Sequence, residues 1–254
     1  MAGKGSALEI EGRKLSLSNL DKVMYPKAGF TKAHVIDYYI RIAPLLLPHL
    51  RKRPLTLKRY PNGVEGMFFY EKVCPRHRPS WVKTVDVWSH GRDEHIPFCV
   101  VEDIATLVWL ANLADLELHT SLSYATRILH PTMMVFDLDP GAPADLLDCC
   151  KVALLIKSFF DAHKLKVFAK VSGSKGLQLY VPLNDPKVTY DDDTKVFSKK
   201  LAVMLERRHP DLVVSNMLKK LRVGKVLVDW SQNDEHKTTV NVYCLVEIVV
   251  GKVC

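Results

Sequence analysis

The sequence predicts an α+β fold, because segments with strand and helix patterns are mixed along the chain without a steady β-α-β-α alternation. Short apolar runs such as residues 133–140 end in acids or in glycine-containing turns, as strands often do. Longer segments such as residues 31–50 repeat apolar side chains at helical spacing. The 254 residues, 48% hydrophobic and 25% charged, suit a single domain over 1–254 with a substantial core.

Four helices are expected, over residues 31–50, 101–116, 143–164 and 191–209. Thr31 is the expected N-cap of the first helix, and the second reads as mostly buried. Pro143 is expected in the first turn of the third helix, where its missing N–H does no harm. The fourth segment has acids first and bases last, which matches the helix dipole.

Strands are expected within residues 54–63, 133–140, 165–183 and 225–233. The first closes on a Pro-Asn-Gly turn, and the third range holds two strands around a polar, glycine-rich turn. The second and fourth end in acids, so the candidate functional residues stand at strand ends and turns.

The stretch "MMVFDLDPG" places Asp137 and Asp139 at the end of a buried strand. Side chains alternate along a strand, so both carboxylates face one side while Phe136 and Leu138 face the core. Carboxylates this close repel unless a cation or a proton lies between them, and Mg²⁺ or Mn²⁺ prefers such oxygen ligands. Solvated acids before a Pro-Gly turn would give the same pattern.

Two further motifs extend this candidate site. In "VSGSKGLQ", Ser172 and Lys175 lie in a turn whose backbone N–H groups suit an anion, although Walker A spacing is absent and an ordinary polar hairpin turn is the alternative. Asp229 ends a third apolar strand, in "KVLVDWSQN". Three acids on strand ends flanking a phosphate-type turn suit two-metal phosphoryl or nucleotidyl transfer.

The formal charge of +8 favours a polyanionic partner, chiefly nucleic acid or an acidic membrane surface. The cations cluster in residues 51–60, 198–208 and 218–225, as expected for a nucleic-acid track, although solvated helix faces also produce such runs.

No apolar run approaches the roughly 20 residues of a membrane span, and the N-terminus has no apolar signal-peptide core. A cytosolic protein without a membrane partner is therefore expected. The six cysteines have no C-x-x-C spacing, so reduced thiols are expected rather than a zinc site.

The order "VFDLDPG", "SGSKGLQLYVPL" and "LRVGKVLVDWSQN" closely resembles the polymerase domain of ATP-dependent DNA ligase D, in the archaeo-eukaryotic primase superfamily. The segments "LSNLDKVMYPKAGFTKAHVIDYY", "RPLTLKRYPNGVEGMFFYEK" and "LADLELHT" agree, so the resemblance covers roughly residues 15–243. It implies a primase-polymerase fold with mixed or antiparallel central sheets flanked by helices. It also implies templated addition of NTPs or dNTPs to DNA ends and 5′-phosphorylated gaps in prokaryotic non-homologous end joining. A Ku-like protein and a DNA ligase would be partners, in the cytoplasm near the nucleoid.

The resemblance assigns residue roles. Two Mn²⁺ or Mg²⁺ ions would be held by Asp137, Asp139 and Asp229. The nucleotide would be contacted by Ser172, Lys175, Gln178, Arg222, Gln232, His119 and Lys58. DNA would be contacted by Asn19, Lys22, Lys32, Arg59, Phe68 and Phe69. Within that last set Asn19 and the two lysines would hold a 5′-phosphate, and the phenylalanines would stack on template bases. Each role has an alternative without function: the phenylalanines and His119 could belong to the core, and the two lysines could be solvated surface residues.

The chain departs from the family pattern at two places. Gln178 stands where the family has histidine, and glutamine donates a hydrogen bond without carrying charge. Val246 stands where the family has an arginine, and residues 244–254 form an atypical tail in place of a longer segment. Residues 1–14 are expected to be flexible.

These departures support a second hypothesis, a catalytically impaired module that binds DNA ends. A third, a haloacid-dehalogenase-type phosphatase, shares "VFDLD" but usually continues with Gly-Thr, where this chain has Pro140 and Gly141.

Overall fold

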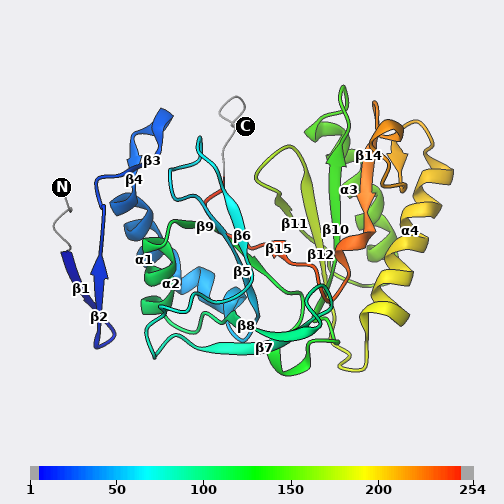
Figure 1. The fold of residues 1–254 in the computed structure, drawn as a ribbon. Helices are drawn as coiled ribbons and strands as arrows, with labels where there is room; N and C mark the ends of the chain where they lie inside the picture. Colours follow the sequence, from blue (N-terminus) through cyan, green and yellow to red (C-terminus); the bar gives the residue numbers. More distant parts are fainter. Residues whose placement is uncertain (1–5, 247–254) are drawn as a thin grey trace. The chain divides into compact units, whose positions relative to one another are not determined.

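The computed structural model describes residues 6–246, which form two compact units. The first unit comprises residues 6–121 and 240–246, and the second comprises Leu122–Thr239. Each unit combines helices with a largely antiparallel sheet (Figure 1), so the predicted α+β class is confirmed. That the whole chain acts as one domain stays a prediction.

The first unit begins with a hairpin of β1 (Ser6–Ile10) and β2 (Arg13–Leu17). Gly12 adopts a φ of 73° in the connecting turn, a backbone conformation that costs glycine little. Leu8 and Ile10 of β1 are partly buried against the core of this unit, and Leu15 of β2 is buried in it. The described part of the expected flexible stretch is therefore paired, because its apolar side chains have a core to bury against.

Two helices pack in the first unit. The predicted helix after Thr31 is present as α1 (Lys32–Leu50), with Thr31 at its N-cap. The second helix, α2 (Ile104–Asn112), is capped by Asp103 and is shorter than the expected 101–116, because the residues after its end turn into a strand. Both helices contribute to one apolar core.

The main sheet of the first unit has strands β5 (Leu55–Arg59), β6 (Phe69–Glu71), β7 (Thr84–Ser89), β8 (Glu94–Cys99) and β9 (Asp115–Thr120). It also has β15 (Thr239–Val240), where the chain returns from the second unit to the first. Their order is β15-β9-β5-β8-β7, with β6 paired to β5. A separate short pair consists of β3 (Val23–Tyr25) and β4 (Phe30–Thr31). The strand predicted within residues 54–63 is confirmed as β5, and the turn predicted after it is also present.

Cys74 and Cys99 form a disulfide, so the expectation of reduced thiols is wrong for this pair. The Cys74 N–H donates to the Pro97 carbonyl of β8 at 2.7 Å, which holds the two cysteines next to each other. They are 25 residues apart in sequence, and only the folded loop brings them together.

The sheet of the second unit has strands β10 (Met133–Pro140), β11 (Phe168–Val171), β12 (Leu177–Pro182), β13 (Val213–Val214) and β14 (Val226–Asp229). Their order is β11-β12-β10-β14-β13, antiparallel except for the parallel β13–β14 pair. The strands predicted around residues 133–140, 165–183 and 225–233 are confirmed.

The helices α3 (Leu146–Ala162) and α4 (Lys195–Arg208) lie beside the sheet of the second unit (Figure 1). Both helices share one apolar core with this sheet. Phe136 and Leu138 of β10 are fully buried in that core, as the alternation predicted. Asp137 and Asp139 consequently lie on the face of the sheet that the helices leave free.

Two helix starts differ from the sequence prediction. Pro143 precedes α3 rather than standing in its first turn, because Asp145 provides the N-cap by accepting from the Leu147 N–H at 2.8 Å. The acids expected at the start of the fourth helix lie in a preceding π-helical turn, Tyr190–Thr194. Among the described residues, no helix is both long and apolar enough to cross a membrane.

Candidate active site

The register of the second unit's sheet places four polar side chains in one row across three strand pairings. Asp137 of β10 is directly opposite Gln178 of β12 on one side and Asp229 of β14 on the other. Lys170 of β11 is in turn opposite Gln178. Directly paired residues of antiparallel strands project to the same face with Cβ atoms about 5 Å apart. Two acids predicted from separate motifs are therefore immediate neighbours.

This crowding changes the protonation of the carboxylates. Burial, followed by the charge of Asp139 and then that of Asp229, raises the pKa of Asp137 to about 7. Burial and the Asp229 charge also raise the pKa of Asp139, whose side chain is 48% exposed. The cluster therefore holds a proton, or another cation, more readily than isolated aspartates would.

The Asp137 carboxylate is only partly satisfied by the protein. Its Oδ2 accepts from the Gln178 amide at 3.1 Å, whereas its Oδ1 is buried without a hydrogen-bond partner. A buried orphan carboxylate oxygen beside two further acids fits a hard divalent cation, which takes oxygen ligands. The donor set of Asp137, Asp139 and Asp229 thus suits the metal ions that the sequence predicted.

Asp229 also organises the turn that follows its strand. Its Oδ1 accepts from the N–H and the hydroxyl of Ser231, and its Oδ2 accepts from the Gln232 amide at 3.2 Å. Gln232, predicted as a nucleotide contact, is thereby held against the acid. The side-chain amide of the fully buried Asn233 accepts a hydrogen bond from the Val135 N–H and donates one to the Val135 carbonyl, which ties this turn to β10.

Gln178, the departure from the family pattern, is a buried partner of the acid cluster. Its amide donates to Asp137, and its Oε1 accepts from the Tyr180 hydroxyl at 2.8 Å. Both ends of the amide are therefore engaged by protein groups, and the residue holds Asp137 without adding charge.

Two glycines let loops approach the strand that carries the acids. A Cβ atom on Gly176 would lie 2.0 Å from the Leu138 carbonyl oxygen, and one on Gly141 would lie 1.9 Å from the Arg222 carbonyl oxygen. Both distances are impossible for a real side chain, so only glycine fits. The glycine-rich turn and the loop bearing Arg222 are thus packed directly against β10.

These loops carry the predicted phosphate ligands. Ser172 closes its turn by donating its N–H to the Gly176 carbonyl and accepting from the Gly176 N–H, while Lys175 is exposed. The Arg222 guanidinium lies 3.9 Å from the Asp139 carboxylate, and its Nε is buried without a partner. The fold therefore places a cation and a backbone turn beside the acids.

The first unit holds a second set of predicted residues, joined by an acid that the sequence prediction missed. The Glu117 carboxylate accepts from Lys58 at 2.7 Å, from the Tyr60 hydroxyl at 2.5 Å and from His119 at 3.1 Å. These hydrogen bonds outweigh the effect of burial and lower the pKa of Glu117 to about 2. Glu117 therefore fixes both predicted nucleotide-pocket residues.

The Lys58 ammonium also anchors exposed aromatic rings. It lies 4.5 Å from the Phe68 ring centroid and 5.9 Å from that of Tyr70, and the Arg59 guanidinium lies 5.3 Å from that of Phe69. The two phenylalanines are each 44% exposed, which contradicts the alternative of core packing. Their ring faces suit a flat partner such as a nucleobase.

Three predicted DNA-binding cations lie near one another in the first unit. The Lys32 side chain is buried, and desolvation followed by the charges of Lys22 and Arg59 lowers its pKa to about 8. Lys32 donates to the Ser18 hydroxyl at 3.4 Å. In the neighbouring turn, the Lys22 N–H donates a hydrogen bond to the Asn19 carbonyl oxygen at 3.0 Å. A buried ammonium surrounded by cations is an arrangement that an anion would stabilise.

The comparisons with known proteins identify the class to which this fold and site belong. The family model "LigD, primase-polymerase domain" matches residues 31–247. This chain belongs to the LigD primase-polymerase domain family. The multifunctional non-homologous end joining protein LigD of Mycolicibacterium smegmatis is 38% identical over 91% of this chain and 30% of its own length. That of Mycobacterium tuberculosis is 39% identical over 95% and 32%.

The bifunctional LigD of Bacillus subtilis is 35% identical over 91% of this chain and 36% of its own length. The chain thus spans about a third of these relatives. Among solved structures, the polymerase domain of Mycobacterium tuberculosis ligase D in complex with DNA matches with a TM-score of 0.83 and 37% identity, over 89% of this chain and 80% of that one. The predicted family and the fold that it implied are confirmed.

Proposed function

We propose that this chain catalyses template-dependent addition of NTPs or dNTPs to DNA ends and gaps, as a polymerase module of non-homologous end joining. The observation that carries the proposal is the register that sets Asp137 directly beside Asp229 on one face of the sheet. Family membership supports it, and the similar mycobacterial polymerase domain was solved in complex with DNA. Since the relatives are non-homologous end joining proteins about three times as long, a DNA ligase and a Ku-like protein are the proposed partners.

The acid cluster is the proposed metal site. When bound by Asp137, Asp139 and Asp229, two Mg²⁺ or Mn²⁺ ions would supply positive charge to the attacking and leaving oxygens of the transfer. Gln178 holds the Asp137 carboxylate in place through its amide. Ser231 and Gln232 do the same for Asp229, so the protein orients the acids before any ligand arrives.

The loops beside the acids are the proposed triphosphate site. Lys175 and the backbone N–H groups of its turn would bind phosphate oxygens, and Arg222 would contribute a guanidinium. In the first unit, Lys58 and His119 remain proposed nucleotide contacts, and the Glu117 carboxylate already holds both side chains in place. Stacking on Phe68 and Phe69 would hold template bases.

The buried Lys32 is the proposed ligand of a 5′-phosphate at the downstream end of a gap. A phosphate would restore the hydrogen bonds and the countercharge that its ammonium loses on burial. Lys22 and Asn19 lie in the adjoining turn and would complete the site. A catalytically impaired DNA-end binder would retain this 5′-phosphate site.

The test is Asp139→Ala, because this side chain is half exposed and its ion pair with Arg222, at 3.9 Å, is weak. We expect nucleotide addition to fall at least about a thousandfold, with DNA affinity measured by fluorescence anisotropy unchanged. Asp161→Ala, which removes an exposed acid of α3, is the matched control and should keep full activity. Equal activity in the Asp139 variant would refute the metal-site proposal. Loss of DNA binding together with activity would indicate a structural role instead.

A further inference from the structure

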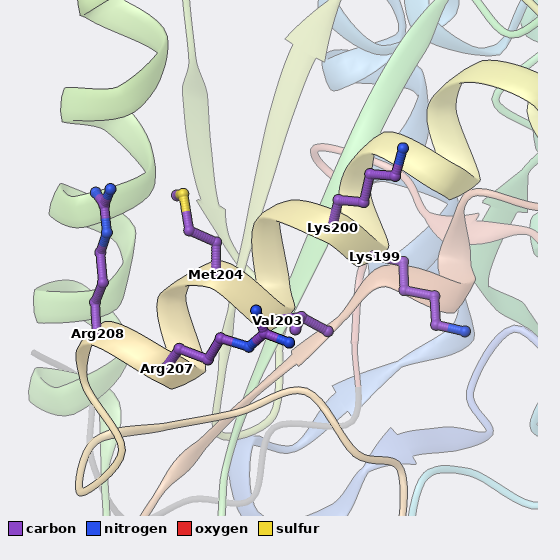
Figure 2. Close-up of a pocket in the computed structure, with 6 residues that line it drawn as sticks. All are labelled: Lys199, Lys200, Val203, Met204, Arg207 and Arg208. Atoms are coloured by element: carbon purple, nitrogen blue, oxygen red, sulfur yellow. The ribbon is translucent and has the colours of Figure 1, made fainter.

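The exposed side of α4 carries a basic groove outside the proposed catalytic site. It is a hollow of about 460 Å³, and Figure 2 shows the side chains that line it: Lys199, Lys200, Val203, Met204, Arg207 and Arg208. We refer to these six residues as the α4 groove. Four of them are cations and two are apolar.

The helix period arranges the α4 groove as two parallel rows. One row is Lys199, Val203 and Arg207, and the other is Lys200, Met204 and Arg208. Residues four apart on a helix are neighbours on one face, so each row reads cation, apolar residue, cation. Eight residues of helix span about 12 Å. The groove therefore has an apolar floor with a pair of cations at each end.

The cations of the α4 groove lack carboxylate partners within the part of the chain that the structure describes. Lys195, one turn earlier, is by contrast paired with Asp234 at 2.6 Å. The acid of this helix segment, Glu206, is engaged by the backbone and hydroxyl of Ser215. Lys199 lies 4.8 Å from the Trp230 ring centroid, which holds it at the rim. Four neighbouring like charges are left for an external anion to neutralise.

We propose that the α4 groove docks an extended acidic segment of a protein partner, with one apolar side chain on the floor and acidic residues over each pair of cations. An extended chain rises about 3.3 Å per residue, so acids four residues apart span about 13 Å and reach both ends. The apolar floor favours a protein over nucleic acid. Protein interfaces combine an apolar centre with a polar rim, whereas a phosphate backbone has no side chain to bury on Val203 and Met204.

The test uses a fluorescent peptide with two pairs of glutamates separated by three residues, of which the middle one is leucine. Binding to the whole chain is measured by anisotropy at about 50 mM salt, where surface charges act over more than 10 Å. Met204→Gln should weaken binding about fivefold, and Lys200→Gln with Arg208→Gln more than about tenfold. Met204→Leu is the matched control and should bind the peptide as tightly as the wild-type chain does.

Three outcomes would overturn the proposal. The first is no binding at peptide concentrations up to about 1 mM. The second is equal binding of a peptide of the same composition with leucine moved to one end. The third is tighter binding of a short DNA duplex to the same face, unaffected by Met204→Gln, which would identify a phosphate track. None of these results depends on catalysis, so they are separate from the test of the proposed function.

Discussion

Asp137→Asn should stabilise the metal-free protein while it abolishes nucleotide addition. In the folded chain burial and the neighbouring acids raise the pKa of Asp137 from 3.8 to about 7. A tenfold change in proton affinity corresponds to about 1.36 kcal/mol, so the ionised side chain lowers the free energy of unfolding by up to about 4 kcal/mol. Asparagine keeps the shape and can still accept from the Gln178 amide, without the charge.

The pH dependence makes this prediction specific. Between pH 4 and 7 the folded state binds a proton that the unfolded state has released, so wild-type stability falls as the pH rises through this range. The gain from Asp137→Asn should therefore be small near the unfolded pKa of 3.8 and largest above 7. Urea unfolding with EDTA, at acidic and at alkaline pH, measures it directly.

The control for this experiment is Asp161→Asn, which breaks an exposed ion pair with Lys157 and should change stability by less than about 0.5 kcal/mol at either pH. A destabilised Asp137→Asn protein above pH 7, or a gain of the same size at both pH values, would refute the electrostatic account of the acid cluster.

Three further predictions concern other parts of the molecule. Gly176→Ala should cost at least about 2 kcal/mol of urea stability, because its Cβ would lie 2.0 Å from the Leu138 carbonyl oxygen. Gly91→Ala, with open space around it, is the control, and equal stability of both variants would contradict the packing. Glu117→Gln should lower the free energy of unfolding by about 3 kcal/mol, because it leaves the largely buried Lys58 ammonium without its carboxylate partner; an unchanged urea midpoint would count against this. The preference for 5′-phosphorylated gaps should weaken as the pH rises above about 8, where Lys32 loses its proton; a preference that is flat to pH 10 in a binding assay would exclude Lys32 as the phosphate ligand.

Local sequence patterns could predict the site's two central acids because strand alternation is a local property. The apolar run before Asp137 places it and Asp139 on one face, and the structure buries the intervening Leu138 as expected. The direct pairing of Asp137 with Asp229 could not be predicted in this way, because register between distant strands depends on the whole sheet.

The sequence did not predict strand β8 or the role of Glu117, and in each case a particular residue shows the physical reason. Pro97 argues against a strand over Glu94–Cys99. In the structure Pro97 pairs with Asp86 of β7, whereas β5 pairs with β8 only at Cys99, so no β5 residue requires the missing N–H of the proline. Glu117 resembles a solvated acid in the apolar segment before His119, and only the ladder that sets it opposite Lys58 reveals its role. The atypical tail predicted for residues 244–254 lies, from residue 247 onward, outside the described residues.

The central claim is that this chain adds nucleotides to DNA under the direction of a template. The most direct test is primer extension on a duplex with a short gap and a downstream 5′-phosphate, with Mn²⁺ and either NTPs or dNTPs. We expect addition of the nucleotides that the template specifies, and the comparison of substrates gives the sugar preference. No addition with either substrate, while binding to the phosphorylated gap persists, would contradict the claim and identify a module that only binds DNA ends.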